Sequence, residues 1–186
     1  MAPDSPRPWT TDRSTVLLDR PPWLRLREDA VRLPTGAVLD PYYVLEYADW
    51  ACVVPVTGEG RVVMVEQWRH GVGAVSLEFP AGAIDPGEGP ESAARRELRE
   101  EAGVEASALE PLGRVAVEPA RHTNWAHLFL AWDVARSASV RPDPGEDLVV
   151  REVPLVDLRG LVAQGRIVHG AHVAAAFLAL DRLAPR

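Results

Sequence analysis

The sequence predicts a mixed α/β fold with a small antiparallel β-sheet at its N-terminus. Two observations support this fold class. Short segments rich in β-branched and aromatic residues recur between residues 14 and 155, separated by Pro or Gly clusters, as is typical of strands and turns. Apolar residues follow helical spacing at residues 90–102 and again at 155–183. A chain of 186 residues is long enough for one well-buried domain and a small appended element.

The N-terminal part is predicted to be a tail followed by a small sheet. Residues 1–13 contain three prolines and few large aliphatic side chains, so we expect a flexible tail. Residues 14–48 hold three β-rich segments separated by Pro and Gly clusters, which predicts an antiparallel meander. A sheet this small can hardly bury its own apolar face, so we expect it to form a homodimer. Residues 49–186 are expected to form the main domain.

The main domain is expected to alternate strands with helices. Residues 50–57 and 61–69 predict a β-hairpin around a turn at Gly58–Gly60. A helix is expected at 90–102, because Pro90 suits a first helical position and Gly103 suits the residue after the last. Further strands are expected at 75–79, 114–118, 125–133 and 149–155, and closing helices at 155–165 and 171–183.

Composition and charge exclude several classes of partner. Asp and Glu number 27 against 20 Lys and Arg, so there is no basic excess to neutralise a nucleic-acid backbone. No apolar run approaches the roughly 20 residues needed to span a bilayer, and no signal peptide is recognisable, so we expect no membrane partner. The single cysteine, Cys52, lies among apolar residues and predicts a buried thiol in a reducing compartment. We therefore expect a cytoplasmic protein.

Three glutamates near the end of the central helix need a reason other than stability. Glu97, Glu100 and Glu101 follow i, i+3, i+4 spacing and share one helix face. They repel one another and face the negative end of the helix dipole, each effect costing a few tenths of a kcal/mol. A hard divalent cation such as Mg²⁺ would make the arrangement favourable. Charge alone would favour a solvated helix face, with Arg95, Arg96 and Arg99 compensating the acids.

The residues around this helix decide between the two interpretations. The chain reads Gly82, five residues, Glu88, seven residues, Arg96-Glu97-Leu98, one residue, Glu100-Glu101, one residue, Gly103-Val104. This spacing resembles the Nudix box at every defining position, so we interpret the chain as a Nudix hydrolase. The order of strands and helices from about Trp50 onward is also similar to that family. A metal-dependent enzyme is therefore favoured over a solvated helix.

The resemblance implies a fold, a cofactor and a set of site residues. The fold is an α/β/α sandwich with a mixed sheet, and the reaction is hydrolysis of a diphosphate linkage with Mg²⁺ or Mn²⁺ as cofactor. Arg96 and Glu88 would form a supporting ion pair, and Gly82 and Gly103 would permit backbone turns that other residues resist. The implied metal ligands are the carbonyl of Ala81 and the carboxylates of Glu97, Glu100 and Glu101.

Further segments resemble the branch that cleaves ADP-ribose and nucleotide sugars. The string LEFPAGAIDPGE includes Glu78, and VEQWRHG includes Arg69; in that branch these positions contact substrate. Pro119 lies about where the branch places a marker proline. The implied reaction converts ADP-ribose to AMP and ribose 5-phosphate. Alternatives are other nucleoside diphosphate derivatives, including GDP- and UDP-sugars and coenzyme A, a nucleoside triphosphate, or a module that senses nucleotides without turnover.

The identity of the general base is left open by the sequence. The branch often supplies an acid from the loop after the box, but the corresponding position here is Asn124, whose amide cannot accept the proton. Candidates are a box glutamate, Glu118, Glu146 and His122. We favour a box glutamate or Glu146 as the base, and we assign His122 and Asn124 to substrate contact.

Overall fold

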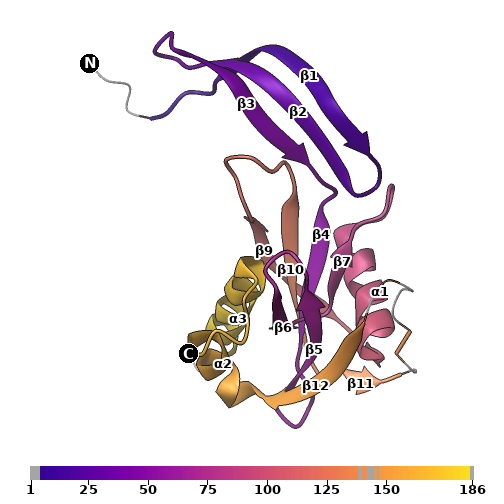
Figure 1. Ribbon diagram of the computed structural model, residues 1–186. Coiled ribbons are helices and arrows are strands. Elements are labelled where there is room, and N and C mark those ends of the chain that lie inside the picture. The colour runs from indigo at the N-terminus through magenta and orange to yellow at the C-terminus, as the bar shows by residue number, and fades with distance from the viewer. Residues whose placement is uncertain (1–4, 138–139, 142–144, 146, 185–186) are drawn as a thin grey trace. The chain divides into compact units, whose positions relative to one another are not determined.

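The computed structural model describes residues 5–137, 140–141, 145 and 147–184, which form two compact units. Unit 1 comprises Met1–Tyr47 together with Glu118–Asn124. Unit 2 comprises Ala48–Val117 together with Trp125–Arg186. The predicted fold class is confirmed, since a small antiparallel sheet precedes a mixed α/β unit (Figure 1).

Unit 1 is built on a three-stranded antiparallel sheet in the order β1-β2-β3. Its strands are β1 (Thr10–Arg20), β2 (Leu24–Arg32) and β3 (Val38–Glu46). Strand β1 begins within the segment expected to be a tail. Thr10 pairs with Arg32 across the sheet, and Arg32 also forms an ion pair with Asp12 at 2.5 Å. β-branched residues and a cross-strand ion pair therefore extend the strand toward the N-terminus.

The loop at residues 118–124 belongs to unit 1. Leu45 on β3 donates its N–H to the carbonyl of Arg121 at 2.8 Å, and its own carbonyl accepts the N–H of Thr123 at 3.1 Å. The ring of His122 lies edge-on to the ring of Tyr47, with centroids 5.1 Å apart. Backbone pairing thus attaches this loop to the edge of the small sheet.

Unit 2 contains two main sheets. The mixed sheet has the order β7-β4-β10-β9, in which β4 runs parallel to β10 and the other pairs are antiparallel. The second sheet is antiparallel with the order β12-β5-β6, and β11 and β8 form a short pair. The strands are β4 (Trp50–Pro55), β5 (Arg61–Arg69), β6 (Ala74–Glu78), β7 (Ala81–Ala83), β8 (Val104–Glu105), β9 (Leu109–Ala116), β10 (Trp125–Ala131), β11 (Ala135–Arg136) and β12 (Leu148–Pro154).

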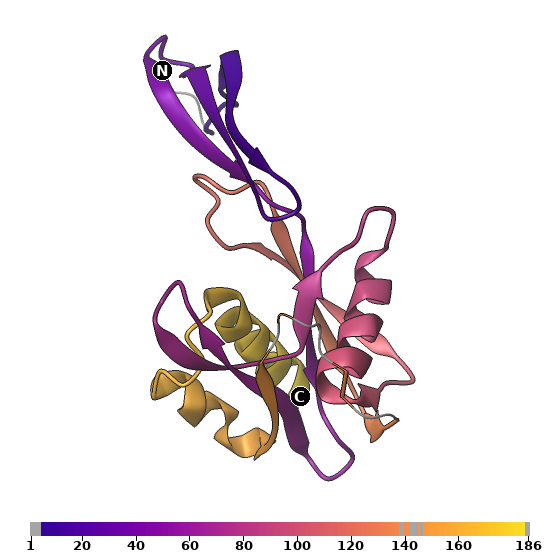
Figure 2. The same cartoon turned by 45° about the vertical axis from the view of Figure 1, so that its right-hand side comes forward.

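Three α-helices and one 3-10 turn accompany these sheets in the described part of unit 2. They are α1 (Pro90–Ala102), η1 (Leu155–Asp157), α2 (Leu158–Ala163) and α3 (Gly170–Leu183). Figures 1 and 2 show α1 on one side of the mixed sheet and α3 on the other. No helix in the described part of the chain is long and apolar enough to cross a membrane.

Strand β4 explains why helices cover both faces of the mixed sheet. Its residues alternate between two buried clusters: Cys52 and Val54 face a cluster that includes residues of α3, while Ala51 and Val53 face a cluster that includes residues of α1. A strand that is apolar on both faces must be covered on both. The predicted α/β/α sandwich is confirmed. Burial also raises the pKa of the Cys52 thiol, as expected for a packing residue rather than a reactive one.

Of the hairpin predicted at residues 50–69, only the turn is confirmed. Thr57 donates its N–H to the carbonyl of Arg61 at 2.8 Å, and a single bridge joins Val56 to Val62. Beyond this bridge the two strands separate, β4 into the mixed sheet and β5 into the antiparallel sheet. Each strand has hydrogen-bonded partners of its own on both edges: β7 and β10 flank β4, and β12 and β6 flank β5.

Candidate active site

Helix α1 has the bounds that the sequence predicts. Pro90 occupies the first turn, and the helix ends at Gly103, whose φ of 63° is left-handed and whose N–H bonds the carbonyls of Leu98 and Arg99. Glycine adopts this conformation with little strain, so Gly103 ends the helix for the expected reason. Ala93 and Ala94 of α1 are buried in one cluster with Ala51 and Val53 of β4.

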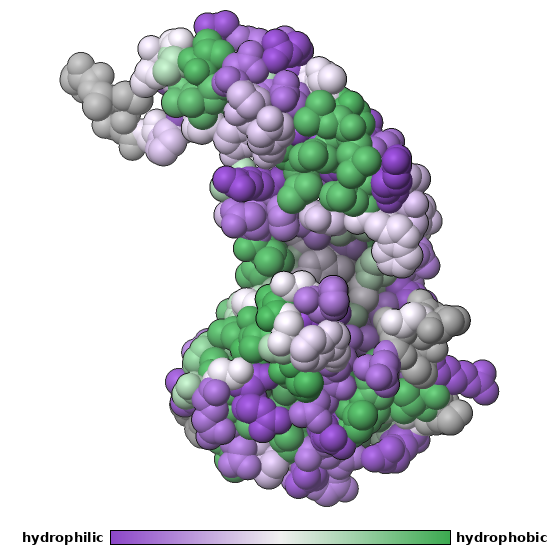
Figure 3. Space-filling model, viewed as in Figure 1, coloured by the Kyte–Doolittle hydropathy of each residue, from purple (hydrophilic) through white to green (hydrophobic). Residues whose placement is uncertain are grey.

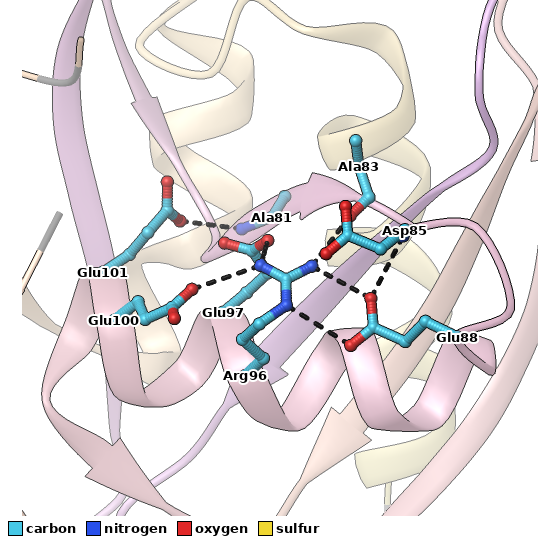
Figure 4. A network of polar contacts seen from close by, with 8 residues as sticks. All are labelled: Ala81, Ala83, Asp85, Glu88, Arg96, Glu97, Glu100 and Glu101. Carbon is cyan, nitrogen blue, oxygen red and sulfur yellow. Dashed lines mark hydrogen bonds and ion pairs between the residues drawn. The ribbon is translucent and has the colours of Figure 1, made fainter. Parts of the chain in front are cut away.

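Arg96 is the centre of a polar network on the open side of α1 (Figure 4). Its guanidinium donates to both carboxylate oxygens of Glu88, at 3.3 and 3.1 Å, and to the carbonyl of Ala83 at 2.8 Å. It also reaches Glu97 at 2.5 Å and Glu100 at 3.1 Å. Hydrogen bonds from Arg96 lower the pKa of Glu88. One cation therefore joins the loop before the helix to two of the three helix carboxylates.

Gly82 is required for space rather than for an unusual backbone conformation. A Cβ at this position would lie 2.1 Å from a carboxylate oxygen of Glu97. The φ of Gly82 is not among the positive values of the chain, so the expected backbone reason is wrong here. The carboxylate of Glu97 packs directly onto the backbone of β7, and a larger residue at position 82 would have to displace it.

Two of the three glutamates near the end of α1 are buried. Glu97 is 6% exposed and Glu101 is 2% exposed, whereas the side chain of Glu100 is 41% exposed. Glu101 accepts the backbone N–H of Ala81 at 2.8 Å, which fixes it beside β7. Burying a carboxylate is unfavourable unless charge and hydrogen bonds compensate it, and Arg96 and the Ala81 amide contribute that compensation.

The donor atoms in this place suit a hard divalent cation. Glu97, Glu100 and Glu101 offer only oxygen, and the backbone of Ala81 lies beside them (Figure 4). Among the described residues, no three acidic, His or Cys side chains already surround one point. Arg96 instead holds Glu97 and Glu100 by their oxygens. The residue types therefore fit a metal, and metal binding would exchange part of the contact with Arg96 for contact with the ion.

Arg69 and Glu78 form a pair next to this network. Two guanidinium nitrogens of Arg69 donate to the two oxygens of Glu78, at 2.9 and 2.5 Å, and Glu78 is fully buried. Burial alone would raise the pKa of Glu78, but the hydrogen bonds from Arg69 and the nearby positive charge outweigh burial and lower it. Glu78 thus holds Arg69 in a fixed position at the surface.

His172 is a buried histidine that the sequence reasoning missed. It is 1% exposed, and its ring stacks between Trp50, at 5.6 Å, and Phe79, at 6.0 Å. Its Nδ1 accepts the N–H of Phe79 at 3.0 Å. Burial lowers the pKa of His172 to about 3, so the ring is neutral at ordinary pH. His169 precedes it by one helical turn, and this i, i+3 pair at the start of the last helix was the available signal.

Two adjoining cavities lie beside the box. One, of about 300 Å³, is lined by Ala81–Ala83, Trp50 and His172. The other, of about 420 Å³, is mainly apolar and includes Trp68 among its lining residues. Arg69 and His169 line both cavities. Volumes of this size are typical of small-molecule sites.

The remaining predicted residues belong to unit 1 or fall outside the residues that the structure describes. Pro119, His122 and Asn124 belong to the loop of unit 1, together with Glu118. Glu146 is outside the residues that the structure describes. Unit 2 therefore brings together the residues predicted on α1, on β5–β7 and in the loop that precedes α1.

Comparison with known proteins gives consistent matches. Residues 47–175 match the family described as NUDIX domain, and residues 9–45 match the nucleoside diphosphate sugar hydrolase N-terminal domain. The chain is 34% identical over 145 residues to the ADP-ribose pyrophosphatase of Bacillus subtilis (strain 168), covering 77% of each chain. It is 32% identical over 129 residues to the methanol dehydrogenase activator of Bacillus methanolicus, covering 68% of this chain and 69% of the relative. A crystal structure of an ADP compounds hydrolase shares the fold, with a TM-score of 0.83, 97% coverage of both chains and 23% identity.

The low pKa of His172 predicts a loss of stability in acid. The unfolded chain binds a proton at this residue below about pH 6.5, whereas the folded chain resists protonation down to about pH 3. The free energy of unfolding is therefore expected to fall as pH is lowered through this window. In His172→Asn, an amide oxygen can still accept the Phe79 N–H but does not titrate, so denaturant unfolding should show a shallower fall. Parallel curves for the two proteins would contradict the assignment.

The lack of space at Gly82 predicts that adding a side chain there destabilises the fold more than adding one at an open glycine. We expect Gly82→Ala to lower the free energy of unfolding by about 1–3 kcal/mol, because the new methyl group must displace the buried Glu97 carboxylate. Gly71→Ala is the matched control, since nothing lies within 4 Å of its Cβ and its φ is not positive. It should change stability by less than about 0.5 kcal/mol. Equal effects of the two substitutions in urea denaturation would show that Glu97 does not pack on Gly82.

Proposed function

Because this chain belongs to the Nudix family of hydrolases, we propose that it cleaves the diphosphate linkage of a nucleoside diphosphate sugar. ADP-ribose is the first candidate, giving AMP and ribose 5-phosphate. The family matched by the N-terminal residues and the names of the B. subtilis relative and of the similar structure support this choice. The observation that carries the proposal is the set of carboxylates on α1, in which Arg96 holds Glu97 and Glu100 and the Ala81 N–H holds Glu101.

The proposed cofactor is Mg²⁺, with Mn²⁺ as the alternative. Glu97, Glu100, Glu101 and the carbonyl of Ala81 would hold it. A bound divalent cation would neutralise the diphosphate and lower the pKa of a coordinated water. Oxygen donors favour these two metals over the softer ones that prefer sulfur or imidazole.

The chain's own residues have proposed roles in orientation and proton transfer. Arg96 and Glu88 hold the loop against α1 and keep the glutamate oxygens turned toward β7. Arg69, fixed by Glu78, would contact a phosphate or ribose of the substrate. A carboxylate oxygen of a box glutamate or of Glu146 would accept the proton of the attacking water.

The loop of unit 1 and the tail also have proposed roles. His122 and Asn124 would contact substrate rather than accept the proton, and Pro119 would shape their loop. Residues 14–48 would be a dimerisation element and residues 49–186 the catalytic domain, while the tail expected at residues 1–13 would end before Thr10, where β1 begins. A cytoplasmic location is proposed from the composition and from the single buried cysteine.

We predict that Glu100→Gln and Glu101→Gln remain folded but lose activity by roughly 10²-fold or more, because each loses a metal-ligand charge. Glu91→Gln is the control, since Glu91 lies in the first turn of the same helix and pairs with Arg95 rather than with the box. It should hydrolyse substrate at the wild-type rate. The measurement is product formation from a panel of ADP-ribose, GDP- and UDP-sugars, coenzyme A and nucleoside triphosphates with Mg²⁺.

The outcome of the panel also separates the alternatives. If a nucleoside triphosphate is hydrolysed in preference to the sugars, the protein is still a hydrolase but the proposed sugar substrate is wrong. Tight binding of a nucleotide without turnover of any member of the panel would favour a sensing module. Near-normal turnover in both glutamine variants at saturating Mg²⁺ would contradict the metal assignment.

Dimerisation is proposed through the sheet of unit 1. Apolar side chains on it are exposed, among them Leu17 at 49%, Leu39 at 39% and Tyr43 at 47%, and Figure 3 shows hydrophobic patches over this sheet. Exposed patches of this kind commonly mark an interface, and an unpaired edge strand such as β1 invites a second copy.

We predict by light scattering a mass near twice the 20.3 kDa of one chain. Leu17→Asp should shift the protein toward a monomer, because a charge would have to be buried at the interface. Val156→Asp, at a position of unit 2 that is 86% exposed, should leave the mass unchanged. A wild-type monomer at tens of micromolar would remove the proposed dimer.

A further inference from the structure

We propose that His169 binds the substrate directly, as an uncharged hydrogen-bond donor, at the place where the two cavities of unit 2 meet. This inference rests on the proposed function, since it concerns the same substrate. His169 carries no role in the box and lies more than sixty positions after it in the chain. Its position follows from the geometry of the last helix.

His169 lines both cavities, so a molecule that occupies both would contact it. The cavity beside Ala81–Ala83 would contain the diphosphate, because the box lies at its edge. The neighbouring cavity is lined by apolar side chains that are largely exposed, including Trp68 at 55% and Val72 at 68%. A molecule that extends from the box into this second cavity must pass His169 and Arg69, the two polar residues shared by both.

The cap of α3 fixes the tautomer of His169. Residue 169 is the N-cap of the helix, and its Nδ1 accepts the N–H of Ala171 at 3.2 Å. When Nδ1 of a neutral imidazole is an acceptor, the proton is on Nε2. The ring is also held edge-on to Trp50, at 5.1 Å, and to His172, at 4.8 Å. The orientation of the donor is therefore set before any ligand arrives.

The charge of His169 suits its place. Burial lowers the pKa of the ring, so it is neutral at ordinary pH. Next to it, the guanidinium of Arg69 is held by the buried carboxylate of Glu78. A neutral N–H beside this pair can bind an acceptor oxygen without bringing a second positive charge into the cavity. A phosphate oxygen or a ribose hydroxyl offers such an acceptor, and both occur in nucleoside diphosphate sugars.

Two substitutions separate the cap from the contact with substrate. Asn is as good an N-cap as any residue, so His169→Asn keeps an acceptor for Ala171 but removes the ring N–H. His169→Ala removes both. We expect the thermal midpoint to fall for the Ala variant and to stay near wild type for the Asn variant. In both variants we expect KM to rise roughly 3- to 10-fold with a smaller change in kcat, as for the loss of one neutral hydrogen bond. A wild-type KM in His169→Asn would overturn the inference.

A binding measurement gives a second readout that does not depend on turnover. In protein labelled with ¹⁵N-histidine, the Nε2 signal of His169 should shift on addition of the products in the presence of Mg²⁺. A shift with AMP alone would assign the contact to the nucleotide half, and a shift with ribose 5-phosphate alone would assign it to the sugar half; either supports the inference. The absence of any shift with both products would overturn it.

The two proposals fail in distinguishable ways. If no nucleoside diphosphate sugar is hydrolysed but the His169 signal shifts with AMP, the proposed reaction is wrong and the contact stands. If the sugars are hydrolysed but His169→Asn behaves as wild type and no signal shifts, the reaction stands and the contact is wrong.

Discussion

The guanidinium of Arg96 is the interaction on which the rest of the site depends. It binds Glu88, Glu97 and Glu100 at once and also the carbonyl of Ala83. Without a cation there, Glu97 would be a buried carboxylate next to two others, and removing one partner of a buried pair is strongly destabilising. The helix dipole disfavours carboxylates at the end of α1, and glutamates at i, i+4 spacing repel one another. The acidic end is tolerated because the Arg96 guanidinium binds two of these carboxylates. The same contacts hold the loop before α1 in place.

The packing of the mixed sheet brings this network together. Strand β4 is buried on both faces, and α1 meets it through Ala93 and Ala94, whose small side chains allow a close approach. Because β7 pairs with β4, the close approach of α1 to β4 also brings the Glu97 carboxylate into contact with Gly82 of β7. The core thus sets the separation between the helix that carries the carboxylates and the strand that carries Ala81. The packing of the core therefore determines where the site lies.

The parts that could be predicted from the sequence are those encoded locally. Pro90 and Gly103 mark the ends of α1, and the spacing of the box residues identifies the family, because both patterns lie within one short segment. The separation of residues 50–57 and 61–69 into different sheets could not be predicted, since it depends on strands paired far along the chain. The attachment of the loop at residues 118–124 to unit 1 rests on backbone hydrogen bonds to Leu45, which carry no sequence pattern. His172 meets Phe79 across 93 positions, so the partner of its ring nitrogen could be found only in three dimensions.

We propose that the oxygens around Arg96 and Gly82 form a divalent-metal site. This claim can be tested by anomalous diffraction from crystals of the full chain soaked in Mn²⁺. We expect one or more anomalous peaks bounded by the carboxylates of Glu97, Glu100 and Glu101 and by the carbonyl of Ala81, with part of the contact to Arg96 released. Crystals in which Arg96 keeps all its contacts, and in which Mn²⁺ is bound only elsewhere or not at all, would contradict the claim.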